Sequence, residues 1–404
     1  MIKKSRHGAR TALSLLILTA LGASYANFAL YRQLPPLVAK TASVHLNVAS
    51  SPSKLNWPTA GQAAVAVAGS TILESHGTQK PVPIASVAKV ITALVVLEKK
   101  PLLTTSSTPS FTLTEKDVAI YDDYVAKEGS VIPVSAGEQI SEYQAIEAIM
   151  LPSANNIADS LAIWAFGSLA NYQTAANSYL ATHGLKQTRV GNDASGYSPT
   201  STSTAEDLAK LGLLAMSHPV LSQIVAQETT TDIPGVAISK NVNFLLGVSN
   251  IVGIKTGNTD EAGGVYLSAS RATIDGDPKT IITAYVGAPT LFQALKSSLP
   301  LITSAQANFS PNNLLTQGAV VGEYRQPWGG LVTAVTETNL VTNAWNGSKI
   351  SASAKLNSID VNAHLGQVVG SVISDQSSQD RADIILSTRP TMPSVWWRLM
   401  HPLR

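Results

Sequence analysis

The sequence predicts an α/β (α+β) fold followed by a small β-rich domain, and three observations support this prediction. A strand pattern at residues 64–73 is separated from strand patterns at 251–255, 264–270 and 280–287 by a long region with helical periodicity. A sheet built from such strands is closed by segments that are distant in the sequence. Residues 307–390 hold short β-patterned runs between Asn, Gly, Ser and Asp turns, which indicates a separate β-rich unit.

The composition is that of a globular protein with room for two domains. The chain has 404 residues, of which 45% are hydrophobic and 13% are charged. Its formal charge is only +2, so nucleic acid is not an expected partner. The absence of cysteine excludes disulfides, thiolate nucleophiles and Cys-ligated zinc. Since a His-Glu-x-x-His motif is also missing, we predict no metal and no cofactor.

The first 31 residues predict a segment that targets the membrane. Residues 11–31 carry no charge and are rich in Leu, Ala and Ile, which is enough to span a bilayer core of about 30 Å. The cations that precede them are Lys3, Lys4, Arg6 and Arg10. Because cationic flanks stay in the cytoplasm, we expect an extracytoplasmic body anchored to the cell membrane. A signal peptide cleaved near Ser24-Tyr25-Ala26 is the alternative, and the apolar residues beyond that point favour the anchor.

The other segments follow in order. Residues 32–60 contain four prolines among Ser, Thr, Ala and Asn, which indicates an extended spacer. The main domain is predicted over residues 61–306, where helical periodicity dominates residues 141–218. After the β-rich unit, residues 391–404 form a candidate amphipathic tail that suits a membrane interface. A frayed end or a contact with the β-rich unit is the alternative for this tail.

The segment Ser86-Val-Ala-Lys89 places a hydroxyl next to an amine. If Ser86 opens the helix that is predicted to run through Leu97, Lys89 lies about one turn away on the same face. The N–H groups at a helix N-terminus favour negative charge on the serine oxygen or on a bound carbonyl. Lys89 can accept the serine proton only as a neutral amine, which requires its pKa to fall by about three units; burial and a second nearby cation could supply that shift. Alone, the pattern also describes a capping serine and a surface lysine.

The segment Ser153-Ala-Asn155 follows a proline and lies between two helical patterns. In a loop, positions i and i+2 can direct a hydroxyl and an amide into one cleft. The hydroxyl of Ser153 could then pass on a proton while the amide of Asn155 binds a carbonyl. A polar turn in which an asparagine caps the next helix is the structural alternative.

The segment Lys255-Thr-Gly257 ends a strand pattern. Lys255 and Gly257 are expected to face one way and Thr256 the other. Lys255 can attract a carboxylate, and Gly257 leaves room for a peptide beside the strand edge. An edge-strand lysine that merely discourages aggregation is the structural alternative.

In this order, the three segments resemble the Ser-x-x-Lys, Ser-x-Asn and Lys-Thr-Gly motifs of the penicillin-binding protein and serine β-lactamase superfamily. The flanking sequences at 83–98, 203–209 and 253–263 are similar to those of the low-molecular-mass D-Ala-D-Ala carboxypeptidases. The resemblance implies a penicillin-binding transpeptidase-like catalytic domain, with an antiparallel sheet flanked by helices and a helical subdomain. It also implies that a small β-domain follows.

The resemblance implies catalytic roles for four residues. Ser86 would be the nucleophile, and Lys89 would be the base for its acylation. Ser153 and Asn155 would assist proton transfer and orient the substrate. The substrate would be a peptidoglycan stem peptide that ends in D-Ala-D-Ala.

The resemblance also implies how the substrate is held. Lys255 and Thr256 would bind its terminal carboxylate, with the chain passing beside Gly257. The backbone N–H groups of Ser86 and Asn258 would form the oxyanion hole. β-Lactams would be covalent inhibitors of the same site.

The sequence therefore predicts a serine D-Ala-D-Ala carboxypeptidase of the bacterial cell envelope. A D,D-endopeptidase of the same family, or a receptor that binds β-lactams or peptidoglycan without turnover, is the alternative. A class A β-lactamase is disfavoured because a Glu-x-x-Leu-Asn pentad is missing, and a Ser-His-Asp hydrolase because Gly-x-Ser-x-Gly is missing.

Overall fold

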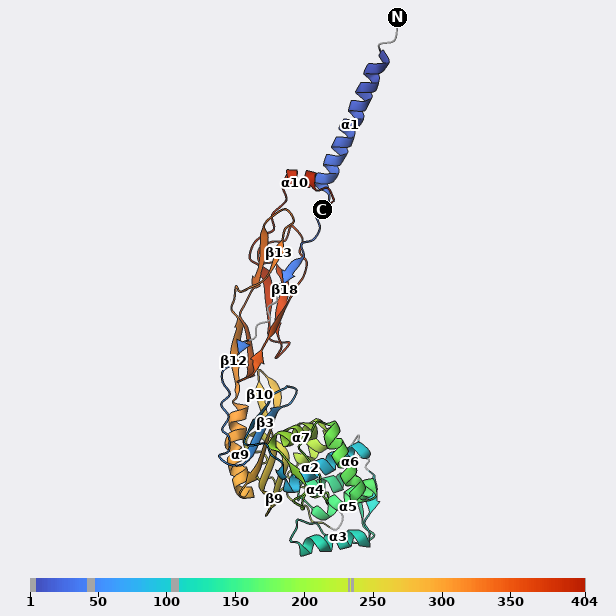
Figure 1. Ribbon diagram of the computed structural model, residues 1–404, viewed down its shortest axis with the longest axis vertical. Helices are drawn as coiled ribbons and strands as arrows, with labels where there is room; N and C mark the ends of the chain where they lie inside the picture. Colours follow the sequence, from blue (N-terminus) through green and yellow to red (C-terminus); the bar gives the residue numbers. More distant parts are fainter. Residues whose placement is uncertain (1–4, 42–47, 103–108, 232, 234–235, 404) are drawn as a thin grey trace. The chain divides into compact units, whose positions relative to one another are not determined.

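The computed structural model describes residues 5–41, 48–102, 109–231, 233 and 236–403 (Figure 1). Lys3, Lys4 and Arg404, which belong to the predicted membrane segments, lie outside the described residues. The chain divides into two compact units. One comprises Ser53–Phe309, and the other joins Met1–Pro52 to Ser310–Arg404.

The unit Ser53–Phe309 is built on a five-stranded antiparallel sheet in the order β4-β3-β11-β10-β9. Its strands are β3 (Gln62–Val67), β4 (Leu73–His76), β9 (Ile251–Thr259), β10 (Gly263–Ile274) and β11 (Asp277–Ala288). Val65 of β3 lies opposite Thr283 of β11, so strands from both sides of the helical insert meet inside the sheet. Two small ribbons pair β5 (Val82–Pro83) with β8 (Thr202–Ser203) and β6 (Ser110–Thr112) with β7 (Gln139–Ser141).

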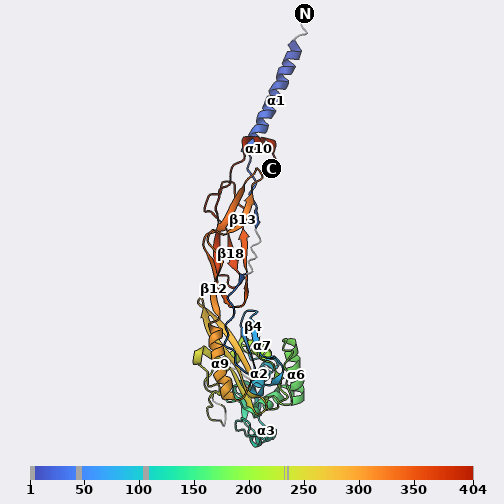
Figure 2. The ribbon, with the colours of Figure 1, turned by 60° about the vertical axis from the view of Figure 1, so that its left-hand side comes forward.

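Helices cover both faces of this sheet (Figures 1 and 2). The helix α9 (Leu291–Gln306) packs on β10 and β11 on one side, and α7 (Ala205–Ser217) packs on β3 and β11 on the other. A methyl group added at Gly212 of α7 would come within 2.5 Å of the Ile282 side chain, so helix and sheet approach closely there. The remaining helices are α2 (Ala88–Lys99), α3 (Glu115–Ala126), α4 (Glu142–Met150), α5 (Asn155–Phe166), α6 (Leu169–Thr182) and α8 (Pro219–Val225), with 3-10 turns η1 (Ala85–Val87) and η2 (Val248–Asn250).

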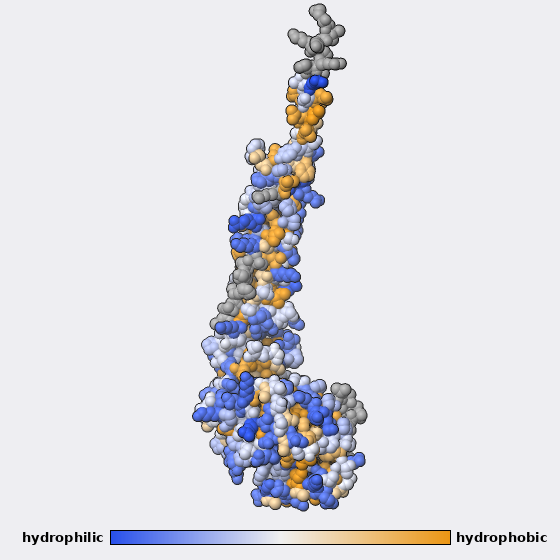
Figure 3. Space-filling view, turned by 45° about the vertical axis from the view of Figure 1, so that its right-hand side comes forward, coloured by the Kyte–Doolittle hydropathy of each residue, from blue (hydrophilic) through white to orange (hydrophobic). Residues whose placement is uncertain are grey.

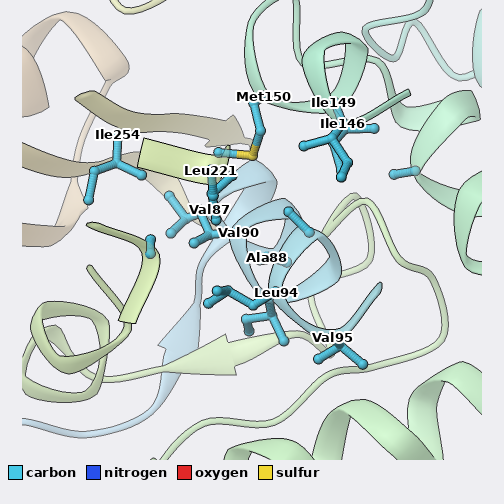
Figure 4. Packing of buried hydrophobic residues seen from close by; sticks show 14 of the residues in the cluster. Val87, Ala88, Val90, Leu94, Val95, Ile146, Ile149, Met150, Leu221 and Ile254 are labelled. Carbon is cyan, nitrogen blue, oxygen red and sulfur yellow. The ribbon is translucent and has the colours of Figure 1, made fainter. Parts of the chain in front are cut away.

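The helix α2 runs through the core of this unit. Every residue from Ala88 to Leu97 is buried. Figure 4 shows Val90 among apolar side chains that include Met150 of α4 and Leu221 of α8. Each such side chain contributes about 1.5–3 kcal/mol when it is fully buried, so the position of α2 is strongly fixed. Lys89 belongs to this helix and is therefore held in an environment that excludes water.

The second unit is a β-structure with one helix at each end of its chain. A six-stranded sheet has the order β1-β13-β14-β19-β18-β17, and β12 pairs with β15 and β2 with β16. The strands are β1 (Ala39–Thr41), β2 (Val48–Ala49), β12 (Phe309–Leu315), β13 (Val320–Arg325), β14 (Leu331–Thr336), β15 (Leu340–Trp345), β16 (Lys349–Ile350), β17 (Ala352–Leu356), β18 (Val368–Ser374) and β19 (Arg381–Leu386). The helices are α1 (Ser5–Tyr31) and α10 (Val395–Met400). A buried apolar cluster that includes Val332 and Ile384 forms a core separate from that of the other unit.

Part of the predicted spacer, residues 32–60, is ordered strand in this unit. β1 forms an edge of the six-stranded sheet, with Ala39 opposite Tyr324 of β13. Just before it, the backbone N–H of Leu37 donates to the carbonyl of Ile359 at 2.8 Å. The physical reason is that an unpaired sheet edge offers hydrogen bonds to an extended chain passing beside it, whatever its side chains are. Composition alone therefore did not predict these strands.

Candidate active site

Ser86 and Lys89 are in direct contact. The Nζ atom of Lys89 donates a hydrogen bond to Oγ of Ser86 at 2.8 Å. Ser86 does not open the long helix as predicted, because it is the middle residue of the 3-10 turn η1 that precedes α2. The turn still leads directly into α2, so a separation of three residues brings the hydroxyl and the amine together.

Lys89 is fully buried and makes two further hydrogen bonds. Its Nζ donates to Oδ1 of Asn155 at 2.6 Å and to the carbonyl of Ser195 at 2.9 Å. A neutral amine has two N–H groups and one lone pair. The protonated amine donates to Ser86, Asn155 and Ser195. Once it is neutral, its two N–H groups can serve Asn155 and Ser195, and its lone pair then faces Ser86 Oγ and can accept the serine proton.

Two buried lysines determine the electrostatics of the site. Burial and then the nearby charge of Lys255 hold the pKa of Lys89 well below its usual range, against the opposite effects of Asp193 and Asp159. Burial also lowers the pKa of Lys255 to about 7. Lys255 is 1% exposed, and its Nζ donates to the carbonyl of Thr256 at 3.0 Å. The arrangement favours the neutral amine that a base requires.

Asn155 and Ser153 occupy the junction between α4 and α5. Asn155 is the first residue of α5 rather than part of a loop, and its N–H donates to the carbonyl of Ser130 at 2.7 Å. Ser153 is 6% exposed and has a positive φ of 68°. In the described residues, the hydrogen bonds of Lys89 do not include Ser153. The structure therefore joins Asn155 to the Ser86–Lys89 pair and leaves Ser153 without a direct bond to Lys89.

The segment Lys255-Thr-Gly257 lies on β9, the last strand of the five-stranded sheet. A methyl group added at Gly257 would lie 3.0 Å from the carbonyl oxygen of Ile84 and 3.2 Å from the backbone nitrogen of Ser86. Glycine thus allows the strand to approach the turn that carries the hydroxyl. Asn258 follows at an exposed position. An edge strand in this position, beside the Ser86 hydroxyl, can pair with an extended peptide.

Four residues around Lys89 were not predicted from the sequence. They are Tyr124, Asp159, Asp193 and Ser195. Asp159 follows Asn155 by four residues, so the helical spacing could have placed both on one face of α5. Ser195 acts through its backbone carbonyl, which no sequence motif reveals. Among the residues that the structure describes, no group of three or more His, Asp or Glu could hold a metal ion.

Comparison with known proteins identifies relatives of this chain. A family model described as D-alanyl-D-alanine carboxypeptidase matches residues 50–290. A D-alanyl-D-alanine endopeptidase of Pseudomonas aeruginosa is 30% identical over 217 residues, which cover 52% of this chain and 66% of that protein. The D-alanyl-D-alanine carboxypeptidase DacA of Escherichia coli is 28% identical over 281 residues, which cover 66% of this chain and 68% of that protein. The alignments thus span about two thirds of the length of these curated relatives.

A solved structure supports the fold. Penicillin binding protein 5 from Haemophilus influenzae superposes with a TM-score of 0.58 at 21% sequence identity. The superposition covers 84% of this chain and 98% of that structure. The predicted fold class, an α/β (α+β) domain with an antiparallel sheet and a β-rich unit, is confirmed.

Proposed function

The chain belongs to the D-alanyl-D-alanine carboxypeptidase family, a family of serine peptidases, and from that premise we propose that Ser86 is its nucleophile. The observation that carries the proposal is the 2.8 Å distance between Nζ of the buried Lys89 and Oγ of Ser86, across which a neutral amine can accept the serine proton. Because burial and Lys255 keep the pKa of that amine low, it can act as a base near neutral pH. The proposed substrate is a peptidoglycan stem peptide that ends in D-Ala-D-Ala.

In the proposed acylation, Ser86 Oγ attacks the carbonyl carbon between the two D-alanines while its proton moves to the lone pair of Lys89. Backbone N–H groups of Ser86 and Asn258 stabilise the negative oxygen that forms. The C–N bond then breaks, and the nitrogen of the departing D-Ala takes a proton from the Lys89 ammonium, with the Ser153 hydroxyl as relay. Asn155 keeps the amine in place during these transfers.

Deacylation completes the cycle. Water attacks the ester carbon and gives one proton to Lys89, which returns it to Ser86 Oγ as the shortened peptide leaves with a new carboxyl group. In a β-lactam, the same attack opens the ring, and the nitrogen stays attached to the acyl group. β-Lactams are therefore expected to remain as esters of Ser86 and to inhibit the enzyme.

The terminal carboxylate of the substrate is proposed to bind Lys255 and Thr256, with the peptide along β9 at Gly257. Lys255 has a pKa of about 7, so it is only partly charged when the site is empty. A carboxylate beside it favours the charged form, which then attracts that carboxylate. Such a charge-assisted hydrogen bond contributes roughly 1.5–3 kcal/mol.

The proposed activity is tested by the release of D-Ala. The whole protein in detergent is incubated with a diacyl-Lys-D-Ala-D-Ala peptide, and free D-Ala is quantified over time. We expect release by the wild type and none by Ser86→Ala. A D-Ala signal that is equal in both proteins would contradict the role of Ser86.

A D,D-endopeptidase remains the second candidate, because the Pseudomonas aeruginosa relative carries that name. A cross-linked peptide dimer separates the two activities. Cleavage of the dimer at a rate comparable to D-Ala release would establish endopeptidase activity. If neither substrate is cleaved although penicillin acylates the protein, the chain is a receptor.

We also propose that α1 remains attached as a membrane anchor. Residues Arg10–Tyr31 form a helix that is long and apolar enough to cross a membrane. Large apolar side chains along it, such as Leu16 and Leu18, are exposed, and Figure 3 shows hydrophobic residues gathered on this segment. Exposed apolar surface of this kind is expected to face lipid.

Contacts between the two ends of the chain hold the end of α1, and one of them, from the hydroxyl of Tyr25 to the carbonyl of Leu399, would be lost on cleavage near Ala26. Nη1 of Arg398 in α10 donates to the carbonyls of Leu30 at 2.7 Å and Arg32 at 3.1 Å. Nη2 of Arg32 donates in return to the carbonyl of His401 at 2.7 Å. The last carbonyls of a helix have no partner within it, so Arg398 caps the end of α1. Trp396, which belongs to the same helix as Arg398, is exposed and suits a membrane interface.

Cleavage near Ala26 would remove most of α1 but leave Arg32, so the proposal has a direct test. The protein is extracted from membranes with detergent, and its intact mass is measured. We expect a mass that still includes α1. A mass that begins at Asn27 would show that α1 is a cleaved signal peptide.

A further inference from the structure

A tight turn presents the backbone carbonyl that Lys89 uses. The turn comprises residues 193–198 and is folded around the carboxylate of Asp193. Oδ1 of Asp193 accepts hydrogen bonds from the backbone N–H groups of Ser195 at 2.8 Å and Gly196 at 2.6 Å, and Oδ2 accepts from that of Ser198 at 2.8 Å. Gly196 has a φ of +74°, and a methyl group added to it would come within 2.0 Å of the carbonyl of Ala85. The turn therefore lies directly against the segment that carries Ser86.

Asp159 of α5 also holds this turn. Its Oδ1 accepts from the backbone N–H of Ala194 at 2.7 Å, and its Oδ2 accepts from the hydroxyl of Tyr124 at 2.9 Å. The Tyr124 hydroxyl also lies 3.1 Å from Oγ of Ser195. Asp159 is 5% exposed and Tyr124 is 4% exposed, so these bonds have little competition from water. The carboxylate of Asp159 thus fixes Ala194, which precedes Ser195, and the Tyr124 hydroxyl, which contacts the Ser195 side chain.

The position of the Ser195 carbonyl determines where the lone pair of Lys89 points. A neutral amine that donates to both Asn155 and Ser195 directs its lone pair to the third neighbour, Ser86 Oγ. If the carbonyl moved away, one N–H would turn toward Ser86 and the lone pair would no longer face the serine proton. The geometry of the turn is therefore a requirement for proton transfer, although the turn itself does not touch the substrate.

We propose that Asp159 is a positioning residue, which holds the Ser195 carbonyl on Lys89 through its bonds to the N–H of Ala194 and the hydroxyl of Tyr124. Its negative charge also acts on the amine of Lys89. The proposal rests on the proposed roles of Ser86 and Lys89. It adds that a residue of α5, Asp159, controls how well Lys89 acts as the base. Asp159 is one helical turn beyond Asn155, so the same helix supplies one acceptor of Lys89 directly and orients the other.

The sign of the charge effect follows from the groups around the pair. The charged or titratable groups that face Lys89 or Asp159 are Lys255, Asp193, Tyr124 and Tyr172. Burial raises the pKa of Asp159 to about 7, so this carboxyl gains its charge in the range where Lys89 is needed as a base. Ionised Asp159 raises the pKa of Lys89, whereas Lys255 lowers it.

Asp159→Asn tests the proposal. The amide oxygen can still accept from Ala194, but the negative charge is lost. We expect the acid limb of the pH profile for Ser86 acylation to move to lower pH by about half a unit to one unit. The rate constant for acylation by a labelled penicillin is measured from pH 5 to 9 on the whole protein. A merely structural role would lower the rate at every pH and leave the limb in place.

A matched control and a second variant complete the experiment. Asp122→Asn makes the same change at an exposed position of α3 and should leave the profile unchanged. If Asp159→Asn does not fold, Tyr124→Phe removes one donor from the carboxylate and should move the limb in the same direction by less. An unshifted limb in a folded Asp159→Asn, or in Tyr124→Phe when the first variant fails, overturns the proposal. Absence of any adduct on the wild type would instead overturn the role of Ser86.

Discussion

Lys89→Arg is expected to lower the rate of Ser86 acylation by about 10²–10⁴-fold, the usual contribution of a general base. Arginine keeps the positive charge and the hydrogen-bond donors, but its pKa above about 12 leaves it without a lone pair for the serine proton. The substitution therefore separates a base from a mere cation at this position. The measurement is the rate constant for acylation by a labelled penicillin at pH 7 and 9.

Lys99→Arg is the control for this variant, because it makes the same substitution at an exposed position near the end of α2. The control should acylate like the wild type. Since Lys89 is fully buried, the thermal unfolding of Lys89→Arg has to be compared with that of the wild type. A folded Lys89→Arg that acylates within a few-fold of the wild type would show that another group removes the proton.

Lys255→Met is expected to have two effects. First, it removes the cation that lowers the pKa of Lys89, so the acid limb of the acylation profile should move to higher pH by about one unit. This direction is opposite to that expected for Asp159→Asn. Second, it removes the proposed partner of the substrate carboxylate, which should lower kcat/KM for D-Ala-D-Ala peptides about 10- to 100-fold.

The two effects are separated by a substrate without the carboxylate. The peptide amide has no terminal charge, so Lys255→Met should reduce its cleavage much less than that of the free acid. Methionine preserves most of the side-chain volume in this fully buried position, which limits the loss of stability. Equal losses for the acid and the amide would place the carboxylate elsewhere.

Short sequence motifs predicted those parts of the site that depend on the side chains of the motifs themselves. Ser86 and Lys89 meet because three residues separate them in a helical segment, and Asn155 joins them from the helix that follows the second motif. The sheet could also be predicted, since its strands carry clear apolar runs on both sides of the helical region. The roles assigned to the site residues stay predictions, which concerns Ser86, Lys89, Ser153, Asn155, Lys255, Thr256, Gly257 and Asn258.

The remaining features depend on contacts that no short pattern encodes. The carbonyl of Ser195 reaches Lys89 from 106 positions away in the sequence, through a backbone atom that every residue possesses. Asp159 looks like a polar residue on an ordinary helix until its burial is known. The strand β1 pairs through its backbone at a sheet edge, so the pattern of its side chains did not predict a strand.

The most direct test of the proposed site is the mass of the protein after reaction with a labelled penicillin. We expect one penicillin for each wild-type chain, attached to the peptide that contains Ser86, and no adduct on a folded Ser86→Ala variant. The absence of an adduct on the wild type, or an adduct on any residue other than Ser86, would contradict the assignment of Ser86 as the acylated nucleophile.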